Sequence, residues 1–516
     1  MSSPLVLAFD CGTQSLRALL FNKTGDIAGK VVVKYPPHIV EKFGYAEQEA
    51  EAFSNAMYSA SLQLKAENQE IWKDIKAVSV TTIRDTYVCV DAGMKPLRPI
   101  IMWYDQREAK CEDPLPVTSS AAFQLVGMTE FADQQRKITK ANWIRENEPE
   151  IWAKTHKYLP LSAYMNYLLT DNALDSVASQ AGHIPFDFKN KRWMGRNHVK
   201  YPVFETEKEK MPKLKEPCSV LGRITAAAAE KTGIPEGIPV IASGSDKGCE
   251  SLGTGCITSD KASISFGTAA SIQLVTSKYV EPQLFLPAYP AVVPNLYNPE
   301  IQVYRGYWMI EWFINELAGE TRAEAAALGI SVEQYLNKML DETPIGADGL
   351  ILQPYWGAEL KKPEARGSII GFTDQHTKKH IYRAIIEGIN FDLMRGIKTM
   401  ESRSGIRVKE ITVSGGGAKN DTICQLTADM FGKPIKRIQT HEASGLGCAI
   451  AAFVGIGEFK SFEEAIQSMV HYKACFKPNM AAHKKYEKLY SHIYKRIYPR
   501  LQLLYKEMKH LKGVIK

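Results

Sequence analysis

The first twenty residues contain two apolar runs and one short polar segment between them. The run Leu5–Phe9 is entirely apolar, residues 10–15 read Asp-Cys-Gly-Thr-Gln-Ser, and a second, mostly apolar run extends from residue 16 to Phe21. Neither run is long enough to cross a membrane, and both have the composition of buried strands. The pattern therefore predicts two strands joined by a polar turn.

The side chains of this turn are suited to a phosphate group and a metal ion. Gly12 allows the backbone to approach a ligand closely. Thr13, Gln14 and Ser15, together with the turn amides, can donate hydrogen bonds to phosphate oxygens. Asp10, at the end of the first predicted strand, offers a hard oxygen for Mg²⁺ or its water shell. At this point an ordinary hairpin with a polar tip is an equal alternative.

The same order of elements returns near the middle of the chain. Residues 262–266 are typical of a strand, Gly267 and Thr268 form a second polar turn, and residues 272–275 are typical of a returning strand. Two such turns half a chain apart indicate an internal duplication. We therefore expect two similar α/β domains that face each other, each with one phosphate-binding hairpin.

The small residues Gly253–Cys256 separate the two halves, so we place the domains at 1–255 and 256–516. In the first half, hairpin strands precede a helix predicted over residues 52–64. A Rossmann unit instead begins with a strand that leads directly into a helix. No Gly-x-Gly-x-x-Gly or P-loop motif follows the first predicted strand, so the phosphate site belongs to another nucleotide-binding architecture.

Composition places the chain among ordinary globular proteins. Its 516 residues are 45% hydrophobic, which is ample for two or three domains with large cores. The nine cysteines are scattered and form no Cys-x-x-Cys pair, which favours reduced thiols and excludes a clustered zinc site. No long apolar window and no secretory signal pattern are present, so we expect a cytoplasmic protein.

The net charge of +7 comes from the C-terminal end. Residues 484–516 contain ten Lys and Arg against two Glu, whereas the other residues contain 54 basic and 55 acidic side chains. Apolar residues recur there at helical spacing, which predicts an amphipathic helix packed on the body with a solvated basic face, kinked or split at Pro499. We therefore expect neither nucleic-acid nor membrane binding. A homodimer is left open.

Seven blocks of the sequence, in this order, resemble the FGGY family of carbohydrate kinases within the actin, Hsp70 and hexokinase superfamily. The resemblance covers nearly the whole chain. The blocks are Asp-x-Gly-Thr-x-Ser-x-Arg at 10–17, Glu-Gln at 47–48, Trp-Tyr-Asp-Gln-Arg at 103–107, Lys-Ala-Asn-Trp-Ile-Arg-Glu-Asn at 140–147, residues 367–372 with 380–387, Ser-Gly-Gly-Gly-Ala-Lys-Asn at 414–420, and residues 442–449.

The resemblance implies an α/β fold with two ribonuclease-H-like, actin-like ATPase domains facing each other across a catalytic cleft. It also implies a kinase that uses ATP and Mg²⁺ to phosphorylate a small sugar or polyol, with a pentulose such as xylulose as the first candidate. Glycerol kinase and quorum-signal (autoinducer) kinase are alternatives. A sugar-sensing protein without turnover is the alternative from another functional class.

The resemblance assigns the catalytic role to Asp246. This residue follows the apolar run 238–242, where an α/β sheet binds ligands beyond its strand ends. By itself the segment favours a helix-capping aspartate. The family's matching residue is the general base, so Asp246 would accept the proton of the attacking hydroxyl. Mg²⁺ is expected near Asp10 and Asp246, and Arg17 either adds positive charge near the transferred group or pairs with a local carboxylate.

The second half is expected to hold most of the nucleotide. By resemblance, Gly267 and Thr268 lie near the β- and γ-phosphates, with backbone amides contributing most of the contact. The glycine run with Gly416 and Gly417 resembles the family's adenosine pocket, because glycines let a flat ring approach the backbone. Asn420 would supply a polar contact there.

The acceptor side rests on four residues. Arg84 and Asp85 occupy the place where the family grips substrate hydroxyls, since a guanidinium donates and a carboxylate accepts; a surface ion pair is the alternative. Lys247 departs from the family's neutral amide beside the base, and it either contacts substrate, lowers the pKa of Asp246 or points away along its helix. Trp103 is expected at the rim of the pocket.

Overall fold

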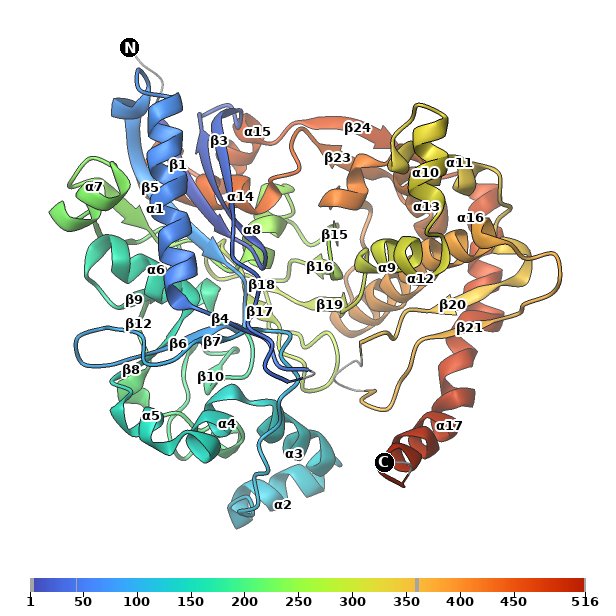
Figure 1. Ribbon diagram of the computed structural model, residues 1–516, viewed down its shortest axis with the longest axis horizontal. Coiled ribbons are helices and arrows are strands. Elements are labelled where there is room, and N and C mark those ends of the chain that lie inside the picture. Colours follow the sequence, from blue (N-terminus) through green and yellow to red (C-terminus); the bar gives the residue numbers. More distant parts are fainter. Residues whose placement is uncertain (1–3, 43, 358–361, 515–516) are drawn as a thin grey trace. The chain divides into compact units, whose positions relative to one another are not determined.

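The computed structural model describes residues 4–42, 44–357 and 362–514 (Figure 1). The chain forms two compact units. The first runs to Gly253 and also includes Tyr289–Tyr297 and Ala443–Val470, and the second holds the remaining described residues. The predicted division at 255 and 256 stays a prediction, because residues from the second half of the chain pack with the first unit.

A six-stranded sheet forms the centre of the first unit. Its strand order is β13 (Val220–Arg223), β14 (Pro239–Ile241), β5 (Ile75–Thr82), β1 (Leu5–Cys11), β2 (Ser15–Phe21) and β3 (Ile27–Lys34). The predicted hairpin is β1 and β2, which pair antiparallel with Asp10 opposite Arg17. β1, β5 and β14 run parallel, so their carboxyl ends lie at one edge of the sheet.

Helices cover both faces of this sheet because the strands are apolar on both sides. Alternate residues such as Leu7 and Phe9 share a core with α1 (Ala50–Glu67) and α6 (Leu161–Thr170). The opposite face packs against α14 (Ala443–Gly455). The unit's other helices are α2 (Val117–Leu125), α3 (Thr129–Ile138), α4 (Lys140–Asn147), α5 (Pro149–Lys154), α7 (Ala226–Thr232), α8 (Asp246–Gly253) and α15 (Phe462–Met469).

The second unit repeats the sheet. Its strand order is β24 (Tyr472–Phe476), β23 (Ile435–Ile438), β22 (Glu410–Ser414), β15 (Lys261–Phe266), β16 (Ala270–Leu274) and β19 (Glu300–Val303). An antiparallel edge strand, three parallel strands and two antiparallel returns follow one another, as in the first unit. The prediction of two similar α/β domains is therefore confirmed.

A long helix, α12 (Lys378–Ser404), packs on this second sheet and forms much of its core. The unit's other helices are α9 (Trp308–Leu317), α10 (Thr321–Ala327), α11 (Val332–Asp341), α13 (Asp421–Phe431), α16 (Met480–Leu489) and α17 (Lys495–Val514). Shorter strands used below are β4 (Glu47–Gln48), β9 (Leu174–Ser176), β10 (Phe186–Asp187), β20 (Ile351–Gln353) and β21 (Ser368–Ile370).

The C-terminal helix agrees only partly with the sequence prediction. Tyr494 and Ile497 are buried, and the Tyr494 ring stacks on Phe391 of α12. Farther along, Leu504 and Met508 are more than half exposed, so packing of this stripe on the body was wrongly predicted there. The helix also continues through Pro499 instead of splitting at it.

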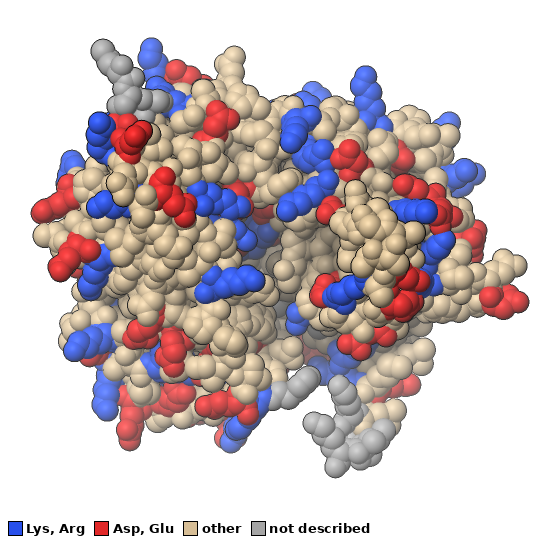
Figure 2. Space-filling view, turned by 45° about the horizontal axis from the view of Figure 1, so that its top comes forward, with Lys and Arg blue, Asp and Glu red and all other residues tan. Residues whose placement is uncertain are grey.

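Surface charge is mixed. On the face that Figure 2 shows, Lys and Arg side chains lie among Asp and Glu side chains rather than in one large patch. Among the helices of the described residues, none combines the length and apolar character that crossing a membrane requires.

Candidate active site

The first polar turn is held by its own backbone and by a partly buried ion pair. The Gly12 amide donates to the Ser15 carbonyl at 3.0 Å. The Arg17 guanidinium lies 3.3 Å from Oδ2 of Asp10, whose side chain is mostly buried at the end of β1. Of the two roles considered for Arg17, pairing with a local carboxylate is therefore present in the structure.

Trp103 orients Thr13 in the same turn. The indole Nε1 donates to the Thr13 hydroxyl oxygen at 3.0 Å. Because an indole N–H can only donate, the hydroxyl is the acceptor in this bond and its own proton stays available for another acceptor. The Gln14 carbonyl accepts from the Tyr35 amide at 3.0 Å. Trp103 thus contacts the first polar turn directly, which its predicted place at the pocket rim did not anticipate.

Asp246 begins α8, a few residues beyond the end of β14. Its Oδ1 accepts from the Lys247 amide at 2.8 Å and lies 3.7 Å from Nε of Arg84. Burial raises the pKa of Asp246, although the charges of Arg84 and Lys247 oppose that shift. A carboxylate with a raised pKa binds a proton more readily than an exposed one, which suits a general base.

Lys247 points along its own helix. Its ammonium lies 2.7 Å from Oε2 of Glu250, one turn later on α8, and both side chains are largely buried. The positive charge beside the candidate base is therefore compensated within the protein. This geometry agrees with the alternative in which Lys247 points away along its helix, and its charge also lowers the pKa of Asp246.

Arg84 and Asp85 follow β5 but face different partners. The Arg84 guanidinium lies 5.0 Å from the ring centroid of Tyr289 and next to Asp246. Oδ1 of Asp85 accepts from the His183 amide at 3.0 Å, while Oδ2 lies 2.8 Å from Lys140 Nζ and 3.0 Å from His183 Nδ1.

The charge of Asp85 is fixed by these neighbours. Burial by itself would raise the pKa of Asp85, but the ammonium of Lys140 and the hydrogen bonds from His183 outweigh burial and hold the pKa well below its usual range. The residue before His183 must be glycine, because a Cβ at Gly182 would collide with the Asp85 carboxylate. Asp85 is thus a fully engaged, ionised side chain.

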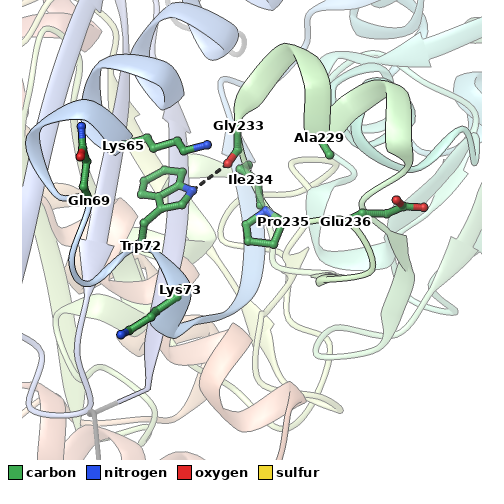
Figure 3. A pocket seen from close by; sticks show the side chains of 9 residues that line it. All are labelled: Lys65, Gln69, Trp72, Lys73, Ala229, Gly233, Ile234, Pro235 and Glu236. Carbon is green, nitrogen blue, oxygen red and sulfur yellow. Dashed lines mark hydrogen bonds between the residues drawn. The ribbon is translucent and has the colours of Figure 1, made fainter.

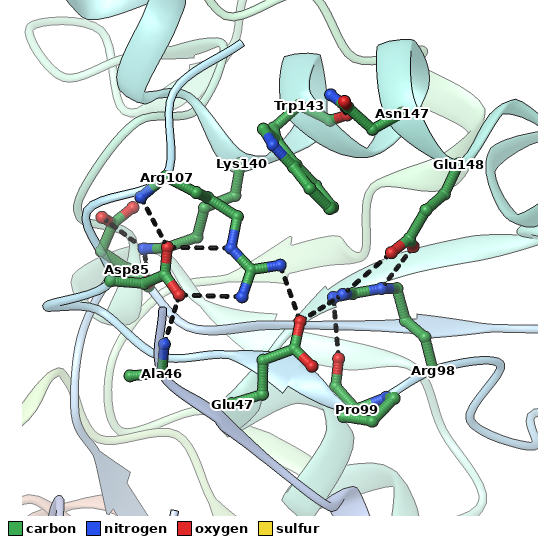
Figure 4. A network of polar contacts seen from close by, with 11 residues as sticks. Ala46, Glu47, Asp85, Arg98, Pro99, Arg107, Lys140, Trp143, Asn147 and Glu148 are labelled. Carbon is green, nitrogen blue, oxygen red and sulfur yellow. Dashed lines mark hydrogen bonds and ion pairs between the residues drawn. The ribbon is translucent and has the colours of Figure 1, made fainter. Parts of the chain in front are cut away.

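The blocks at 47–48, 103–107 and 140–147 meet in one network (Figure 4). The Arg107 guanidinium contacts Asp105 at 2.9 Å and Glu47 of β4 at 2.7 Å. It also lies over the rings of Tyr45 and Trp143, 4.2 and 4.5 Å from their centroids. This network connects α4, which carries Lys140, to the segment that carries Trp103.

In the second unit, the Gly267-Thr268 turn joins β15 to β16 and is held by the residues that lead into α9. The Tyr307 amide donates to the Gly267 carbonyl at 3.0 Å, and the Trp308 amide donates to the Thr268 carbonyl at 3.3 Å. These bonds use the carbonyl oxygens of the turn. In a trans peptide unit the N–H points away from the C=O, so the amides of the same peptide units point away from Tyr307 and Trp308. The turn therefore keeps donors for a phosphate.

The glycine run after β22 combines one crowded and one open position. A Cβ at Gly417 would collide with the Tyr307 ring, whereas no atom lies within 4 Å of the corresponding position at Gly416. Asn420 caps α13, since its oxygen accepts from the Ile423 amide at 3.1 Å and its amide nitrogen contacts Asn337. The predicted contact of Asn420 with adenosine stays a prediction, because its side chain is already engaged.

Sequence comparison agrees with this arrangement. Residues 5–253 match the N-terminal domain of the FGGY family of carbohydrate kinases, and residues 262–456 match its C-terminal domain. The chain belongs to the FGGY family of carbohydrate kinases. Xylulose kinase of Lactococcus lactis is 30% identical over 94% of both chains, and gluconokinase of Bacillus subtilis is 25% identical over 94% of both.

Solved structures agree on the fold of this FGGY kinase. Xylulose kinase from Lactobacillus acidophilus has a TM-score of 0.83 at 23% identity and covers 98% of this chain and 100% of its own. Gluconate kinase from the same organism has a TM-score of 0.82 at 23% identity, with the same coverage of both chains. The predicted two-domain α/β kinase fold is confirmed.

Within the first unit, the fold brings several predicted residues of this FGGY kinase to one sheet edge. The Ile83 amide donates to the Cys11 carbonyl at 3.0 Å, and the Thr81 hydroxyl donates to the Gly244 carbonyl at 2.9 Å. These bonds connect the segments after β1, β5 and β14. Their neighbours at that edge are Asp10, Gly12, Thr13, Ser15, Arg17, Arg84, Asp85, Trp103, Asp246 and Lys247.

Three further residues contact this edge without having been predicted as site residues. Lys140 was quoted only as part of a family block, and His183 and Tyr289 were not singled out. Tyr289 lies about 200 residues from Arg84 along the chain, and no local motif surrounds His183. The one available signal was Asp85 itself. If its carboxylate is buried, it requires a cation or hydrogen-bond donors somewhere in the fold.

The carboxylates fit a magnesium ion that arrives with a nucleotide. Among the described residues, no group of three or more His, Cys, Asp or Glu side chains could hold a metal. Mg²⁺ commonly uses only one or two protein carboxylates together with water and substrate phosphates. Asp10 and Asp246 at the shared sheet edge satisfy that requirement.

Proposed function

We propose that this FGGY kinase transfers the γ-phosphoryl group of ATP to a hydroxyl of an open-chain pentulose, with D-xylulose as the first candidate. The observation that carries the proposal is Asp246, a buried carboxylate with a raised pKa that faces Arg84 at the edge where β5 and β14 end. Xylulose kinases among the relatives supply the substrate candidate. Because the reaction consumes ATP, we place it in the cytoplasm.

The chain's own residues divide the work between proton transfer and phosphate binding. Asp246 accepts the proton of the acceptor hydroxyl as its oxygen attacks the γ-phosphorus. Arg84, stacked on Tyr289 and paired with Asp246, donates to a neighbouring hydroxyl and fixes the direction of the attacking oxygen. A general base of this kind contributes about 10²- to 10⁴-fold to the rate.

Phosphate oxygens require donors rather than a protein nucleophile, since phosphoryl transfer depends mainly on positioning and charge stabilisation. In the first unit the Gly12 amide already binds the Ser15 carbonyl, so the turn amides that follow it and the hydroxyl of Thr13, oriented by Trp103, donate to the transferred group. In the second unit the Gly267-Thr268 turn binds the β- and γ-phosphates, and Gly416 and Gly417 lie against the adenosine. Asp10 and Asp246 would hold Mg²⁺ that arrives with the nucleotide, and the ion would supply charge neutralisation there.

A coupled assay of ADP release tests the proposal. We expect turnover above the ATPase background with D-xylulose, and lower kcat/KM with D-ribulose, gluconate and glycerol. The Asp246→Asn variant should lose about 10²- to 10⁴-fold in kcat. The matched control is Asp348→Asn in the second unit, which removes a half-exposed carboxylate and should leave kcat unchanged.

Three results would contradict the proposal. Preference for gluconate over every pentulose would assign the protein to the activity of its gluconokinase relatives, and full activity of Asp246→Asn would remove the general base. An absence of turnover with all sugars would favour the sugar-sensing alternative.

A further inference from the structure

The segment between β9 and β10 lies against both turns of the acceptor site. The Ser245 amide donates to the Ala178 carbonyl at 3.1 Å, and the Tyr87 hydroxyl donates to the Ala181 carbonyl at 2.8 Å. Ser245 directly precedes Asp246, and Tyr87 lies two residues after Asp85. His183, on this segment, is therefore fixed beside the same sheet edge.

Asp85 determines the tautomer of the His183 ring. Both oxygens of this carboxylate bind His183, Oδ1 through the backbone amide and Oδ2 through Nδ1, each at 3.0 Å. Lys140 lies 2.8 Å from the same Oδ2 and keeps the group ionised. Because an ionised carboxylate can only accept, Nδ1 must carry a proton, and in the neutral ring Nε2 then presents a lone pair.

Nε2 of His183 is available to a ligand. Among the described residues, no donor or acceptor contacts this atom. The atom is also not one of the fully buried polar atoms that lack a partner. The side chain is 19% exposed, so the ring is accessible at one edge while its other edge is fixed. A fixed ring with one open acceptor is the arrangement expected of a group that selects a hydroxyl.

Asp85 itself has little remaining capacity for a substrate. A carboxylate offers about four acceptor positions, and three are used by the His183 amide, His183 Nδ1 and Lys140. The resemblance assigned Asp85 to the substrate, whereas the contacts show that its oxygens hold the neighbouring ring. Of the Asp85–His183 pair, it is the His183 ring that keeps an unoccupied acceptor, Nε2.

We propose that His183 is a substrate-contacting residue, whose Nε2 accepts a hydrogen bond from a hydroxyl of the acceptor sugar other than the one that is phosphorylated. Asp85 and Lys140 are positioning residues that hold the ring in the required tautomer. The hydroxyl is a different one because Asp246 accepts the proton of the attacking oxygen, whereas the His183 ring, in the contacts of the described residues, binds Asp85 rather than Arg84 or Asp246. This inference rests on the proposed function and deepens it.

Two substitutions separate substrate contact from a merely structural role. In His183→Asn the amide nitrogen replaces Nδ1 and keeps the bond to Asp85, but nothing replaces Nε2. In His183→Gln the longer amide reaches the place of Nε2 but gives up the bond to Asp85. We expect His183→Asn to raise KM for the sugar about tenfold, as loss of one hydrogen bond does, with KM for ATP unchanged. His183→Gln should raise it less.

Monodeoxy analogues of the accepted sugar measure the same contact from the substrate side. With one of these analogues, the kcat/KM of wild type should be about tenfold lower than with the parent sugar. His183→Asn should have the same kcat/KM for both sugars, because the Nε2 that binds the missing hydroxyl is already absent. Should His183→Asn fail to fold, as judged by thermal unfolding, the same comparison is made with His183→Gln, which should still discriminate. The matched control is His380→Asn, which alters a His–Asp contact in the second unit and should leave both KM values unchanged.

The possible results are distinguishable. If wild type phosphorylates no sugar, the proposed function and this inference both fail. If wild type is active but His183→Asn keeps its KM, or if His183→Gln is impaired as much as or more than His183→Asn, the ring serves only Asp85. Either result shows that the inference is wrong while the kinase assignment stands. The same holds if wild type uses every monodeoxy analogue that retains the phosphorylated hydroxyl as well as it uses the parent sugar.

Discussion

The two sheets have the same strand order but support their turns by different means. At the edge of the first sheet the side chains are charged and buried, with Asp246 facing Arg84 and Asp85 facing Lys140. The second sheet presents its Gly267-Thr268 turn and its glycine run through backbone groups packed on Tyr307. One architecture therefore carries buried, paired charges in one copy and close backbone contact in the other.

This difference is useful because the two kinds of edge respond to different perturbations. Buried charges depend on every partner being present, since an unpaired ion in a protein interior costs several kcal/mol. A glycine turn depends on space and is insensitive to pH. Substitutions in the two units should therefore give different signatures.

The largest effect is expected where a buried cation of the first unit is removed. Arg107→Met leaves Glu47 and Asp105 without their shared partner, and breaking such a buried network costs about 3–5 kcal/mol. Denaturant titration should show a lower free energy of unfolding. The control is Arg322→Met in the second unit, where both members of the ion pair are about half exposed and the expected change is at most about 1 kcal/mol. Equal losses for the two variants would contradict the comparison.

A pH-dependent effect is expected at Asp175 of the first unit. Burial raises the pKa of Asp175 to about 6, although hydrogen bonds from Ser162 and Ser176 favour the ionised form. The protonated carboxyl is preferred in the fold, so its stabilising contribution is fully present below the unfolded pKa near 4 and is lost as the pH rises through about 6.

The Asp175→Asn variant lacks this titration. Between pH 4 and pH 7 its free energy of unfolding should rise relative to wild type by about 3 kcal/mol, the equivalent of two pKa units. Measuring both proteins across this range cancels the groups that they share. Parallel curves for the two proteins would show that Asp175 titrates normally.

A smaller, pH-independent effect is expected in the second unit. Gly417→Ala forces a methyl group against the Tyr307 ring, and such overpacking costs about 1–3 kcal/mol. Gly416→Ala places the same methyl group in open space and should leave the unfolding temperature unchanged. Thermal unfolding at two pH values checks both the difference and its independence of pH. A loss with Gly416→Ala equal to that with Gly417→Ala would show that backbone freedom, not space, limits this run.

The smallest expected effect is a shift in the pH profile of kcat/KM. Arg84 lowers the pKa of Asp246, so Arg84→Met should move the acid limb of the profile to higher pH. Glu250 raises the same pKa, so Glu250→Gln should move the limb to lower pH. Shifts in the same direction for both variants would show that the limb does not report Asp246.

Sequence reasoning succeeded where function depends on local backbone. The two hairpins, their Gly-Thr turns and the placement of Asp246 after a buried strand follow from alternation and turn chemistry over a few residues. The duplication followed from the same reasoning, and the matching strand orders confirm it. These features need no information about distant parts of the chain.

Reasoning from the sequence was less successful where packing decides exposure. The apolar stripe of α17 predicts burial at every turn, yet Leu504 and Met508 are exposed because periodicity does not reveal where the supporting surface ends. The pocket between α1 and α7, lined by Trp72, Gly233 and Pro235, likewise had no signal (Figure 3). It depends on a hydrogen bond from Trp72 to the Gly233 carbonyl across 161 residues.

The sequence by itself determined the two α/β units, the family and the chemical character of the site, because turn residues and strand patterns act over short distances. Only the tertiary structure decided how the charges are paired: Lys247 with Glu250, Arg17 with Asp10, and Asp85 with Lys140 and His183. A charged side chain pairs with an opposite charge or a hydrogen-bond donor that the fold brings close to it. Burial of the pair determines how strong this interaction is. The proposed contact between His183 and the sugar therefore depends on the packing of this sheet edge.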